Sequence, residues 1–400
     1  MLMRKLFFSF LLALVVPMVA GAQEAYAVYD GEETFTFYYD SDRASRSGES
    51  YDLTPAEYGR PQWYEADWKG NVTKAVFDAS FADARPTTTR YWVGGFSNMT
   101  EIEGIEYLNT SEVTGMSGMF DGCSGLTSLD LSNFKTDNVT SMSNMFDGCS
   151  GLTSLDVSNF KTDNVTSMET MFAGCSGLTS LDVTGFKTDN VTSMETMFYQ
   201  CSGLTSLDMS NFKTDNVTSM YAMFSQCFGL TSLDVSNFKT DNVTDMGGMF
   251  CGCSGLTSLD VTGFKTDNVT DMSQMFAFCS GLATIYCNDD WKARGLNSDY
   301  MFYYCTSLVG GAGTVFDTTK TDATMAHPDV ASNPGYFTRK DGSVSEGDLT
   351  HDGVLDAADV VVLVGLIMNG DPEGDLNGDG KVDVADVLML VNHIIGKKSE

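Results

Sequence analysis

The hydrophobic and polar positions in the middle of the chain recur with a constant spacing of 26 residues. The phrase Leu-Thr-Ser-Leu-Asp begins six times, at Leu126, Leu152, Leu178, Leu204, Leu230 and Leu256. A fixed period of this length is typical of a solenoid, in which each repeat forms one rung stacked on its neighbours. The pattern therefore predicts a long surface and favours a binding function.

Within one repeat, the first apolar residues are spaced as on one face of a helix. Met142, Met145, Phe146 and Cys149 fall at i, i+3, i+4 and i+7. In the next two repeats, Thr166 with Glu169 and Thr192 with Glu195 match the Thr-x-x-Glu capping box, which predicts a helix start. The glycine that follows each cysteine predicts the helix end.

The second half of the repeat predicts a short strand and a return loop. Leu155 and Val157 share one face of an extended segment, with Asp156 between them. We therefore expect an α/β solenoid, a leucine-rich-repeat-like right-handed stack of 26-residue strand–loop–helix rungs. A β-rich cap is expected before it, because residues 34–37 alternate as a strand and residues 72–77 read as another.

The repeats resemble a known family of bacterial surface proteins. Residues 102–110, Val113-Thr114 and the recurring Met-x-x-Met-Phe-x-x-Cys motif are similar to BspA-type leucine-rich-repeat proteins. The resemblance covers roughly residues 70–337 and is very specific, because the match recurs with every repeat. It implies an exported adhesin or binding protein for an extracellular protein or glycan, and it supplies no catalytic residues.

The C-terminus carries two loops that match a calcium-binding pattern. Oxygen side chains fall at loop positions 1, 3, 5, 9 and 12, with glycine at position 6 and a backbone carbonyl at position 7. The predicted ligands are Asp348, Thr350, Asp352, Val354, Asp356 and Asp359 in the first loop, and Asp375, Asn377, Asp379, Lys381, Asp383 and Asp386 in the second. Repulsion among so many carboxylates favours a bound divalent cation in each loop, so two calcium ions are expected.

A helix is expected directly after each loop, at 357–368 and 384–395. This duplicated unit resembles a type I dockerin, the module that attaches an exported protein to a cohesin on a scaffold. The pair of residues at loop positions 10 and 11 is Ala357-Ala358 and Val384-Ala385 instead of Ser-Thr, and Thr350 replaces the usual Asn. These departures put the cohesin partner in more doubt than the calcium.

The N-terminus and the net charge place the protein outside the cell. Residues 1–22 have a basic start, an apolar run and a small-residue end, as in a secretory signal peptide. No later stretch reaches the ~20 apolar residues that a membrane span needs. A net charge of −31 disfavours nucleic acid and anionic lipid as partners. We expect a secreted or cell-surface protein.

One candidate ligand surface is a row of carboxylates on the concave face of the stack. Each Leu-Thr-Ser-Leu-Asp phrase ends in one of them: Asp130, Asp156, Asp182, Asp208, Asp234 and Asp260. A row of this kind could bind cations or basic peptides, but a merely solvated row is an equally good interpretation.

The other recurring side chains favour structural interpretations. The cysteines at 26-residue spacing could form disulfides, but stacked thiols have parallel Cβ vectors, which favours free, buried cysteines. Helical-face spacing favours core packing over a soft-metal site for the Met and Cys residues. The Asn-Val-Thr triplets match a glycosylation signal, but loop chemistry explains them better.

These patterns predict five segments and a non-enzymatic function. The segments are a signal peptide (1–22), a β-rich cap (23–108), the solenoid (109–310), a C-terminal cap and linker (311–345) and a calcium-binding dockerin-like domain (346–397). No catalytic constellation can be assembled within the repeats. We expect an exported binding or adhesion protein; the alternative is an accessory component of a polysaccharide-degrading extracellular assembly.

Overall fold

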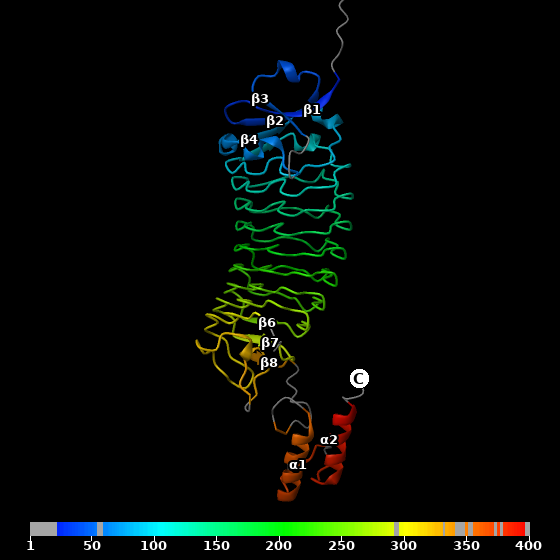
Figure 1. Cartoon of the computed structure of the whole chain (residues 1–400), viewed down its shortest axis with the longest axis vertical. Coiled ribbons are helices and arrows are strands. Elements are labelled where there is room, and N and C mark those ends of the chain that lie inside the picture. Colours follow the sequence, from blue (N-terminus) through cyan, green and yellow to red (C-terminus); the bar gives the residue numbers. More distant parts are fainter. Residues whose placement is uncertain are drawn as a thin grey trace, which may run out of the picture.

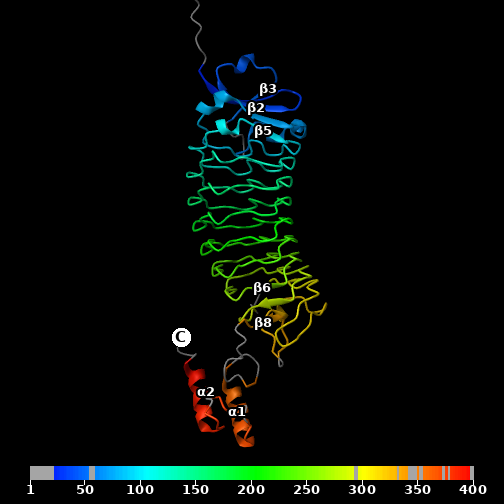
Figure 2. The ribbon, with the colours of Figure 1, turned by 180° about the vertical axis from the view of Figure 1, so that it is seen from behind.

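The computed structural model describes residues 22–53, 59–291, 296–330, 333–340, 349–350, 355–371, 374–376 and 379–396. Along its longest axis it shows a sheet, a stack of rungs and a pair of helices, in chain order (Figures 1 and 2). Residues 1–21, nearly all of the predicted signal peptide, lie outside the described residues. No helix in the described part is long and apolar enough to span a membrane.

A mixed β-sheet begins the described chain. Its strands are β1 (Glu24–Tyr29), β2 (Thr34–Asp40), β3 (Glu49–Asp52), β4 (Lys74–Phe77) and β5 (Glu101–Glu103), in the order β3-β1-β2-β4-β5. β1 pairs antiparallel with β2 and β3, whereas β2, β4 and β5 run parallel. β2 confirms the strand predicted at 34–37, and β4 confirms the second strand from Lys74 onward.

Short 3₁₀ helices connect these strands and cover the sheet. Those described are η1 (Arg43–Ser45), η3 (Gln62–Glu65), η4 (Asp67–Asn71), η5 (Ala79–Asp83), η6 (Ile105–Tyr107) and, near the other end of the chain, η7 (Ala323–Met325). Beneath them, the rings of Phe37 and Phe77 stack at 4.5 Å. The indole N–H of Trp63 donates to the Trp92 carbonyl at 2.9 Å, which ties the sheet to the first rung.

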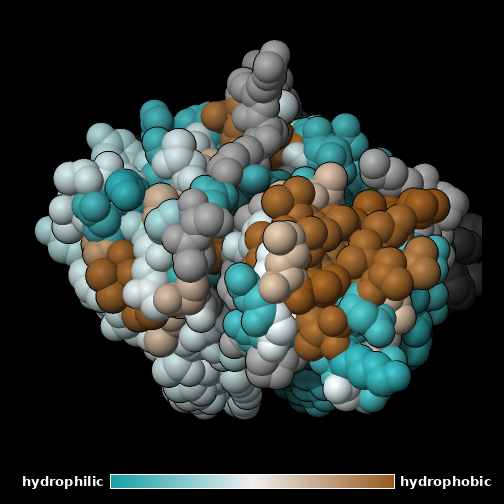
Figure 3. All heavy atoms as spheres, turned by 90° about the horizontal axis from the view of Figure 1, so that it is seen from below, coloured by the Kyte–Doolittle hydropathy of each residue, from teal (hydrophilic) through white to brown (hydrophobic). Residues whose placement is uncertain are grey.

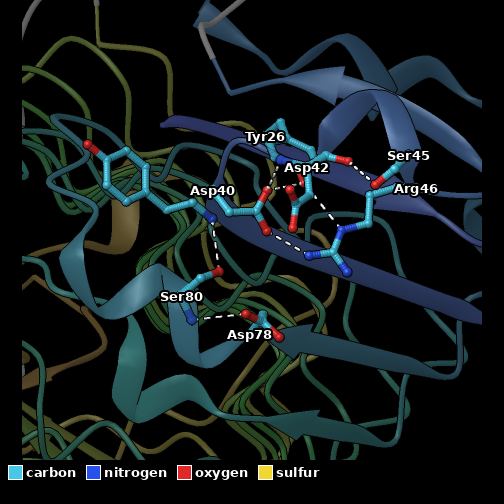
Figure 4. A network of polar contacts seen from close by, with 8 residues as sticks. Tyr26, Asp40, Asp42, Ser45, Arg46, Asp78 and Ser80 are labelled. Carbon is cyan, nitrogen blue, oxygen red and sulfur yellow. Dashed lines mark hydrogen bonds and ion pairs between the residues drawn. The ribbon is translucent and has the colours of Figure 1, made fainter. Parts of the chain in front are cut away.

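A polar network links β1, the end of β2 and the segment after η1 (Figure 4). The Tyr26 hydroxyl donates to one Asp40 oxygen at 2.6 Å, and Arg46 forms an ion pair with the other at 2.6 Å. Burial and the hydrogen bond to Asp40 together raise the pKa of Tyr26 to about 12. On the neighbouring turn, the Ser80 backbone N–H donates to Asp78, which caps η5. Each of these polar groups is paired with another residue of the sheet or of the segments that connect its strands, so the network is structural.

The rungs are joined by a continuous column of parallel backbone bridges. The column runs through Thr88, Gly115, Ser141, Ser167, Ser193, Ser219, Asp245, Asp271 and Asn297. It confirms that the repeats stack, each on the next. The column already includes Thr88, which lies within the segment expected as the N-terminal cap. The predicted division of the chain into five segments stays a prediction.

The predicted helix in each rung is wrong. Phe146 N–H donates to the Met171 carbonyl of the next rung at 2.9 Å, whereas Met145 N–H donates to Met142 within its own rung. Donors therefore alternate between the next rung and a local turn, and the i to i−4 pattern of an α-helix cannot form. Asn144 and Gly148 adopt positive φ, of 59° and 68°, which a helix excludes.

The predicted capping boxes are also absent. The Thr166 hydroxyl donates to the Thr140 carbonyl of the previous rung at 3.2 Å. The Glu169 N–H, which a capping box would pair with Thr166, donates to the Ser167 hydroxyl instead. The predicted strand is extended and alternates correctly, with Leu155 and Val157 buried and Asp156 exposed. Among the described repeats, however, only β6 (Ser258–Asp260) and β7 (Thr284–Tyr286) pair as strands, followed by β8 (Phe337–Thr338).

The core of the stack consists of side-chain columns. Met142, Met145, Phe146 and Cys149 are completely buried, as are their equivalents in the neighbouring rungs. The phenylalanine rings stack face to face from Phe120 to Phe302, with ring centroids 5.6–5.8 Å apart. The apolar spacing thus identified the right core residues although it predicted the wrong backbone.

The return loops are held by two ladders of side-chain hydrogen bonds. The buried Thr162 hydroxyl accepts from the Lys187 N–H at 2.6 Å and donates to the Lys187 carbonyl at 2.9 Å. The Asn164 amide donates to the Asp137 carbonyl at 2.7 Å. The equivalent amides of the other five repeat triplets, from Asn138 to Asn268, are engaged in the same way, so the structure favours the loop interpretation of these triplets over glycosylation.

Two α-helices end the described chain. They are α1 (Ala357–Asn369) and α2 (Val384–Gly396), which confirm the helices predicted after the two loops. Leu363 and Leu390 are completely buried. Asp356 and Asp359 form a capping box at the start of α1, and Gly370 ends that helix in the left-handed conformation.

Candidate functional site

The predicted carboxylate row lies along the exposed side of the Leu-Asp-Val segments. Asp130, Asp156, Asp182, Asp208 and Asp234 are exposed, and Asp260 is half-buried. Figures 1 and 2 show a stack with little curvature, so we call this surface the strand face rather than a concave face. It consists of the six aspartates and the Ser and Thr residues beside them.

Each aspartate of the strand face closes a local turn. Asp156 accepts the Ser158 N–H at 2.9 Å, and Asp182 accepts both the N–H and the hydroxyl of Thr184. Hydrogen bonds of this kind hold the pKa of the Asp156 carboxyl below its ordinary value. The row is therefore ionised at neutral pH, and each of its carboxylates also stabilises a turn of its own rung.

The C-terminal end of the strand face is hollowed, and the side chain of Lys340 lies in this hollow. A cavity of about 610 Å³ is lined by Asp208, Asp234, Asp260, Tyr286 and Lys340, with Ser and Thr hydroxyls between them. Lys340 forms an ion pair with Asp260. The arrangement can bind a basic or hydroxyl-rich ligand.

The cysteine column is reduced and inert. All ten cysteines are free, and nine are buried. The Cys149 thiol donates to the Phe120 carbonyl of the previous rung at 3.1 Å, and its equivalents do the same. Burial raises the pKa of Cys149 well above its ordinary value, so the thiolate that binds metals or reacts does not form. The free, buried interpretation is confirmed.

A second surface, which the sequence patterns above do not predict, lies where the helices were expected. We call it the turn edge: the four x positions of each Met-x-x-Met-Phe-x-x-Cys motif, from Ser117 to Tyr304. These positions differ between rungs, whereas most of the rest of the repeat stays the same. Comparing the repeats column by column would have revealed it.

The turn edge changes in character along the stack. At its N-terminal end it carries Asp121 and Asp147. Two effects raise the pKa of the Asp121 carboxyl to about 6: burial is the larger, and the negative charge of Asp147 is the smaller. Toward the C-terminus its exposed side chains become aromatic, including Tyr221, Phe278 and Tyr304.

The second calcium loop is partly described. Asp375 accepts the backbone N–H groups of Asp379 and Gly380 at 3.1 and 2.9 Å. The buried Asp386 accepts those of Leu376 and Asp383 at 3.0 and 2.8 Å. Gly380 has a φ of 80°, which suits the sharp turn expected at loop position 6. Asn377 lies outside the described residues.

The first loop is described only at its ends. Asp359 is completely buried and accepts both the N–H and the hydroxyl of Thr350. Asp348, Asp352 and Val354 lie outside the described residues. Among the side chains that the structure does describe, no three acidic, histidine or cysteine groups converge as a metal site requires. The oxygen donors suit calcium in kind, but its binding stays a prediction.

The helix pair presents an apolar surface. Figure 3 views the end of the molecule that carries these helices and shows a contiguous apolar patch there. The exposed apolar side chains of the two helices are Val361, Val364, Met368, Val384, Leu388 and Ile395. An exposed patch of this kind on a small module marks an interaction surface.

Comparison with known proteins assigns a family. The family model described as "Mycoplasma protein of unknown function, DUF285" matches residues 93–206 and 192–315, more than half of the chain. None of the curated proteins matches.

Three solved bacterial structures resemble the chain at low identity. A leucine-rich repeat protein from Bacteroides ovatus is 15% identical with a TM-score of 0.22, covering 66% of this chain and 83% of its own. A leucine-rich cell surface protein from Faecalibacterium prausnitzii is 15% identical with a TM-score of 0.26, covering 71% and 91%. A leucine-rich repeat protein from Eubacterium ventriosum is 16% identical with a TM-score of 0.27, covering 74% and 97%. At these values the likenesses assign no function to this chain.

Proposed function

The chain belongs to the DUF285 family, described as Mycoplasma protein of unknown function, and we propose that this member is an exported, non-enzymatic binding or adhesion protein. The observation that carries the proposal is the stack itself. Near-identical rungs, fixed to one another by backbone and side-chain ladders, form a rigid scaffold with two long exposed surfaces. Stacks of this kind contact their ligands over an extended area.

Secretion to the cell surface or the medium is part of the same proposal. The sequence pattern of residues 1–22 supports it. The acidic net charge of −31 also suits an extracellular protein or glycan ligand better than nucleic acid.

A binding array tests the proposal. The mature protein is applied to immobilised extracellular matrix proteins and glycans, beside a panel of chromogenic glycosides that reports hydrolysis. We expect saturable binding to at least one probe and no hydrolysis. Hydrolysis of any glycoside, or binding to none of the probes, contradicts the proposed function.

A triple variant locates the site. If the strand face binds a basic ligand, Asp182→Asn, Asp208→Asn and Asp234→Asn together should weaken binding, and added salt should weaken it in the wild type. Exposed charges are screened within ~8 Å at physiological ionic strength. Unchanged affinity in the variant would place the site elsewhere on the stack.

We further propose that the two C-terminal loops bind two calcium ions and that the helix pair is dockerin-like. The duplicated loop pattern, the glycine at loop position 6 and the helix after each loop support this proposal. In the second loop, Asp375, Asp379, Asp383 and Asp386 would hold the ion, together with Asn377 and the Lys381 carbonyl. Titration calorimetry with calcium should report two sites per chain, and one site in Asp375→Ala, Asp386→Ala.

The exposed apolar face of the helix pair supports a docking role for this module. Its partner would be a cohesin on a scaffold, and the protein would then be an accessory component of a polysaccharide-degrading assembly. A pulldown with the intact protein in calcium and in chelator tests this role. Capture of a cohesin-bearing scaffold only in calcium, and its loss in Met368→Glu, Leu388→Glu, would support it; capture that is independent of calcium would contradict it.

A further inference from the structure

The turn edge is continuous along the stack. The backbone N–H of Gln200 donates to the Ser225 carbonyl at 2.8 Å, that of Gln226 to Cys251 at 2.6 Å and that of Phe278 to Tyr303 at 2.6 Å. In each case, the seventh residue of one motif is hydrogen-bonded to the sixth residue of the next motif. The variable side chains of successive rungs are therefore neighbours in one column.

The C-terminal half of this column is rich in exposed aromatic rings. Tyr300, Tyr304 and Phe278 are 56%, 53% and 47% exposed. The Phe278 ring stacks on Tyr304 at 5.6 Å and meets Tyr303 edge-on at 5.4 Å. Tyr221 is exposed on the turn edge of an earlier rung, and Phe228 is exposed directly after the motif of that rung. Rings gathered in this way on a surface mark a binding site.

The aromatic residues occupy backbone positions that suit glycine. The seventh motif position has positive φ in every rung, and four rungs have glycine there: Gly122, Gly148, Gly174 and Gly252. In two later rungs the same position holds Phe278 and Tyr304, each with a φ of 60°. Bulky residues in this conformation are strained, and such strain is retained mainly where a side chain serves a function.

Polar groups of a particular kind accompany the rings. The Gln200 amide donates to the Gln226 oxygen at 3.0 Å, and both amides donate to the Tyr199 hydroxyl. Amides and hydroxyls both donate and accept hydrogen bonds. The turn edge contains no Lys or Arg, whereas it does contain carboxylates, so it disfavours anionic ligands such as phosphates and sulfated sugars.

Size also favours a ring-shaped ligand. The column ends at a cavity of about 260 Å³ lined by Tyr303, Tyr304, Thr306, Phe316 and Thr318. Drug-sized ligands need roughly 300–1,000 Å³, so this cavity suits one smaller ring with polar substituents. The stacked phenylalanines inside the rungs advance by 5.6–5.8 Å per rung, a step comparable with one sugar residue of an extended chain.

We propose that the aromatic half of the turn edge binds a neutral polysaccharide chain. Phe278 and Tyr304 offer exposed aromatic surface to the C–H groups of sugar rings, and the Gln200, Gln226 and Tyr199 group meets hydroxyls farther along the chain. The proposal rests on the proposed function as a binding protein, whose ligand it narrows to a neutral glycan. A protein partner could contact the same rings, so the test below distinguishes a glycan ligand from a protein ligand.

The test uses the mature protein and neutral hexasaccharides of gluco-, xylo- and manno-configuration, with a sulfated polysaccharide as the charged comparison. Titration calorimetry and affinity gel electrophoresis measure binding. The variant is Phe278→Gly, Tyr304→Gly, which installs the residue that four other rungs carry. The comparison variant is Asp182→Asn, Asp208→Asn, Asp234→Asn, which changes the competing strand face and leaves the turn edge as it is.

We expect binding of at least one neutral hexasaccharide, little dependence on salt, and at least tenfold weaker binding in the glycine variant. The variant should melt no lower than the wild type because glycine relieves the strained φ. The strand-face variant should bind as the wild type does. If the glycine variant does not fold, Phe278→Gln, Tyr304→Gln replaces it, since glutamine occupies this position in two other rungs.

Three results would overturn the inference, and they separate its failure from that of the proposed function. Loss of glycan binding only in the strand-face variant would place the glycan site on the strand face and would still support the proposed binding function. Binding of a matrix protein that depends on Phe278 and Tyr304, with no glycan bound, rejects the ligand class and keeps the function. Binding to neither glycans nor matrix proteins rejects both.

Discussion

In the repeat stack, many backbone N–H groups and the loop hydroxyls are paired by a neighbouring rung, whereas the described polar groups of the loops before α1 and α2 are paired within the same loop and helix start. Lys187 N–H meets Thr162 of the neighbouring rung, but Asp383 N–H meets Asp386 only three residues away. The stack also buries columns of methionine and phenylalanine, while each described helix buries one leucine completely. Each rung is therefore stabilised by its neighbouring rungs. The helix pair buries far less apolar surface, so it needs another source of stability.

The largest effect is expected from calcium on the helix pair. Because the unfolded chain lacks the sites, binding energy becomes folding energy, about 4 kcal/mol per site when free calcium exceeds Kd by 1,000-fold. Scanning calorimetry of the intact chain should show a separate transition for the pair in calcium. That transition should disappear in chelator, and the stack transition should stay.

A second set of scans serves as the control for calcium. Asp375→Ala, Asp386→Ala should weaken the pair in calcium as well, and magnesium should substitute poorly because it demands tighter octahedral geometry. A pair transition that is identical in calcium and in chelator would show that the helices are stable alone.

The next effect is expected from the aromatic column inside the stack. Phe198 is completely buried and stacks between Phe172 at 5.7 Å and Phe224 at 5.8 Å. Phe198→Ala should cost ~3–5 kcal/mol because it opens a cavity between two rungs. Phe278→Gly, an exposed phenylalanine on the turn edge, should cost nothing. Equal losses of unfolding free energy in urea would contradict a stack held by its interior columns.

A smaller effect is expected from one link of the threonine ladder. Thr188 accepts the Lys213 N–H at 2.7 Å and donates to the Lys213 carbonyl at 2.8 Å. Thr188→Val keeps the shape but leaves both backbone groups unpaired, which costs ~1–3 kcal/mol. Thr188→Ser keeps the hydroxyl and should cost clearly less. If the two variants melt at the same temperature, the ladder does not stabilise the rungs.

The smallest effect concerns Asp121 at the N-terminal end of the turn edge. Its pKa, raised to about 6, means that the folded state holds a proton that the unfolded state has released. Stability due to this group is therefore present below its ordinary pKa of 3.8 and is lost as pH rises to about 6. Asp121→Asn should be more stable than the wild type at pH 7 by ~1 kcal/mol, after discounting for partial exposure. This advantage should vanish near pH 4 in paired urea titrations.

Much of the fold and part of the candidate site could be predicted from the sequence. The period identified the stack, and the spacing identified Met142, Met145, Phe146 and Cys149 as core. The strand predicted at 34–37, both C-terminal helices and the free cysteines were right. The wrong element was the helix of each rung, and the surface that was not predicted is the turn edge, which lies on the segment expected to be that helix.

The sequence by itself determined which residues are repeated, which are buried and where the carboxylates of the two loops are concentrated. These properties depend on residue type and spacing, which the chain carries locally. Only the tertiary structure decided the backbone of the Met-x-x-Met-Phe-x-x-Cys segment and the exposure of Phe278 and Tyr304. The physical reason is that alternate N–H groups of that segment bond to the next rung, and a spacing of i, i+3, i+4 and i+7 cannot reveal a hydrogen-bond partner 25 residues away.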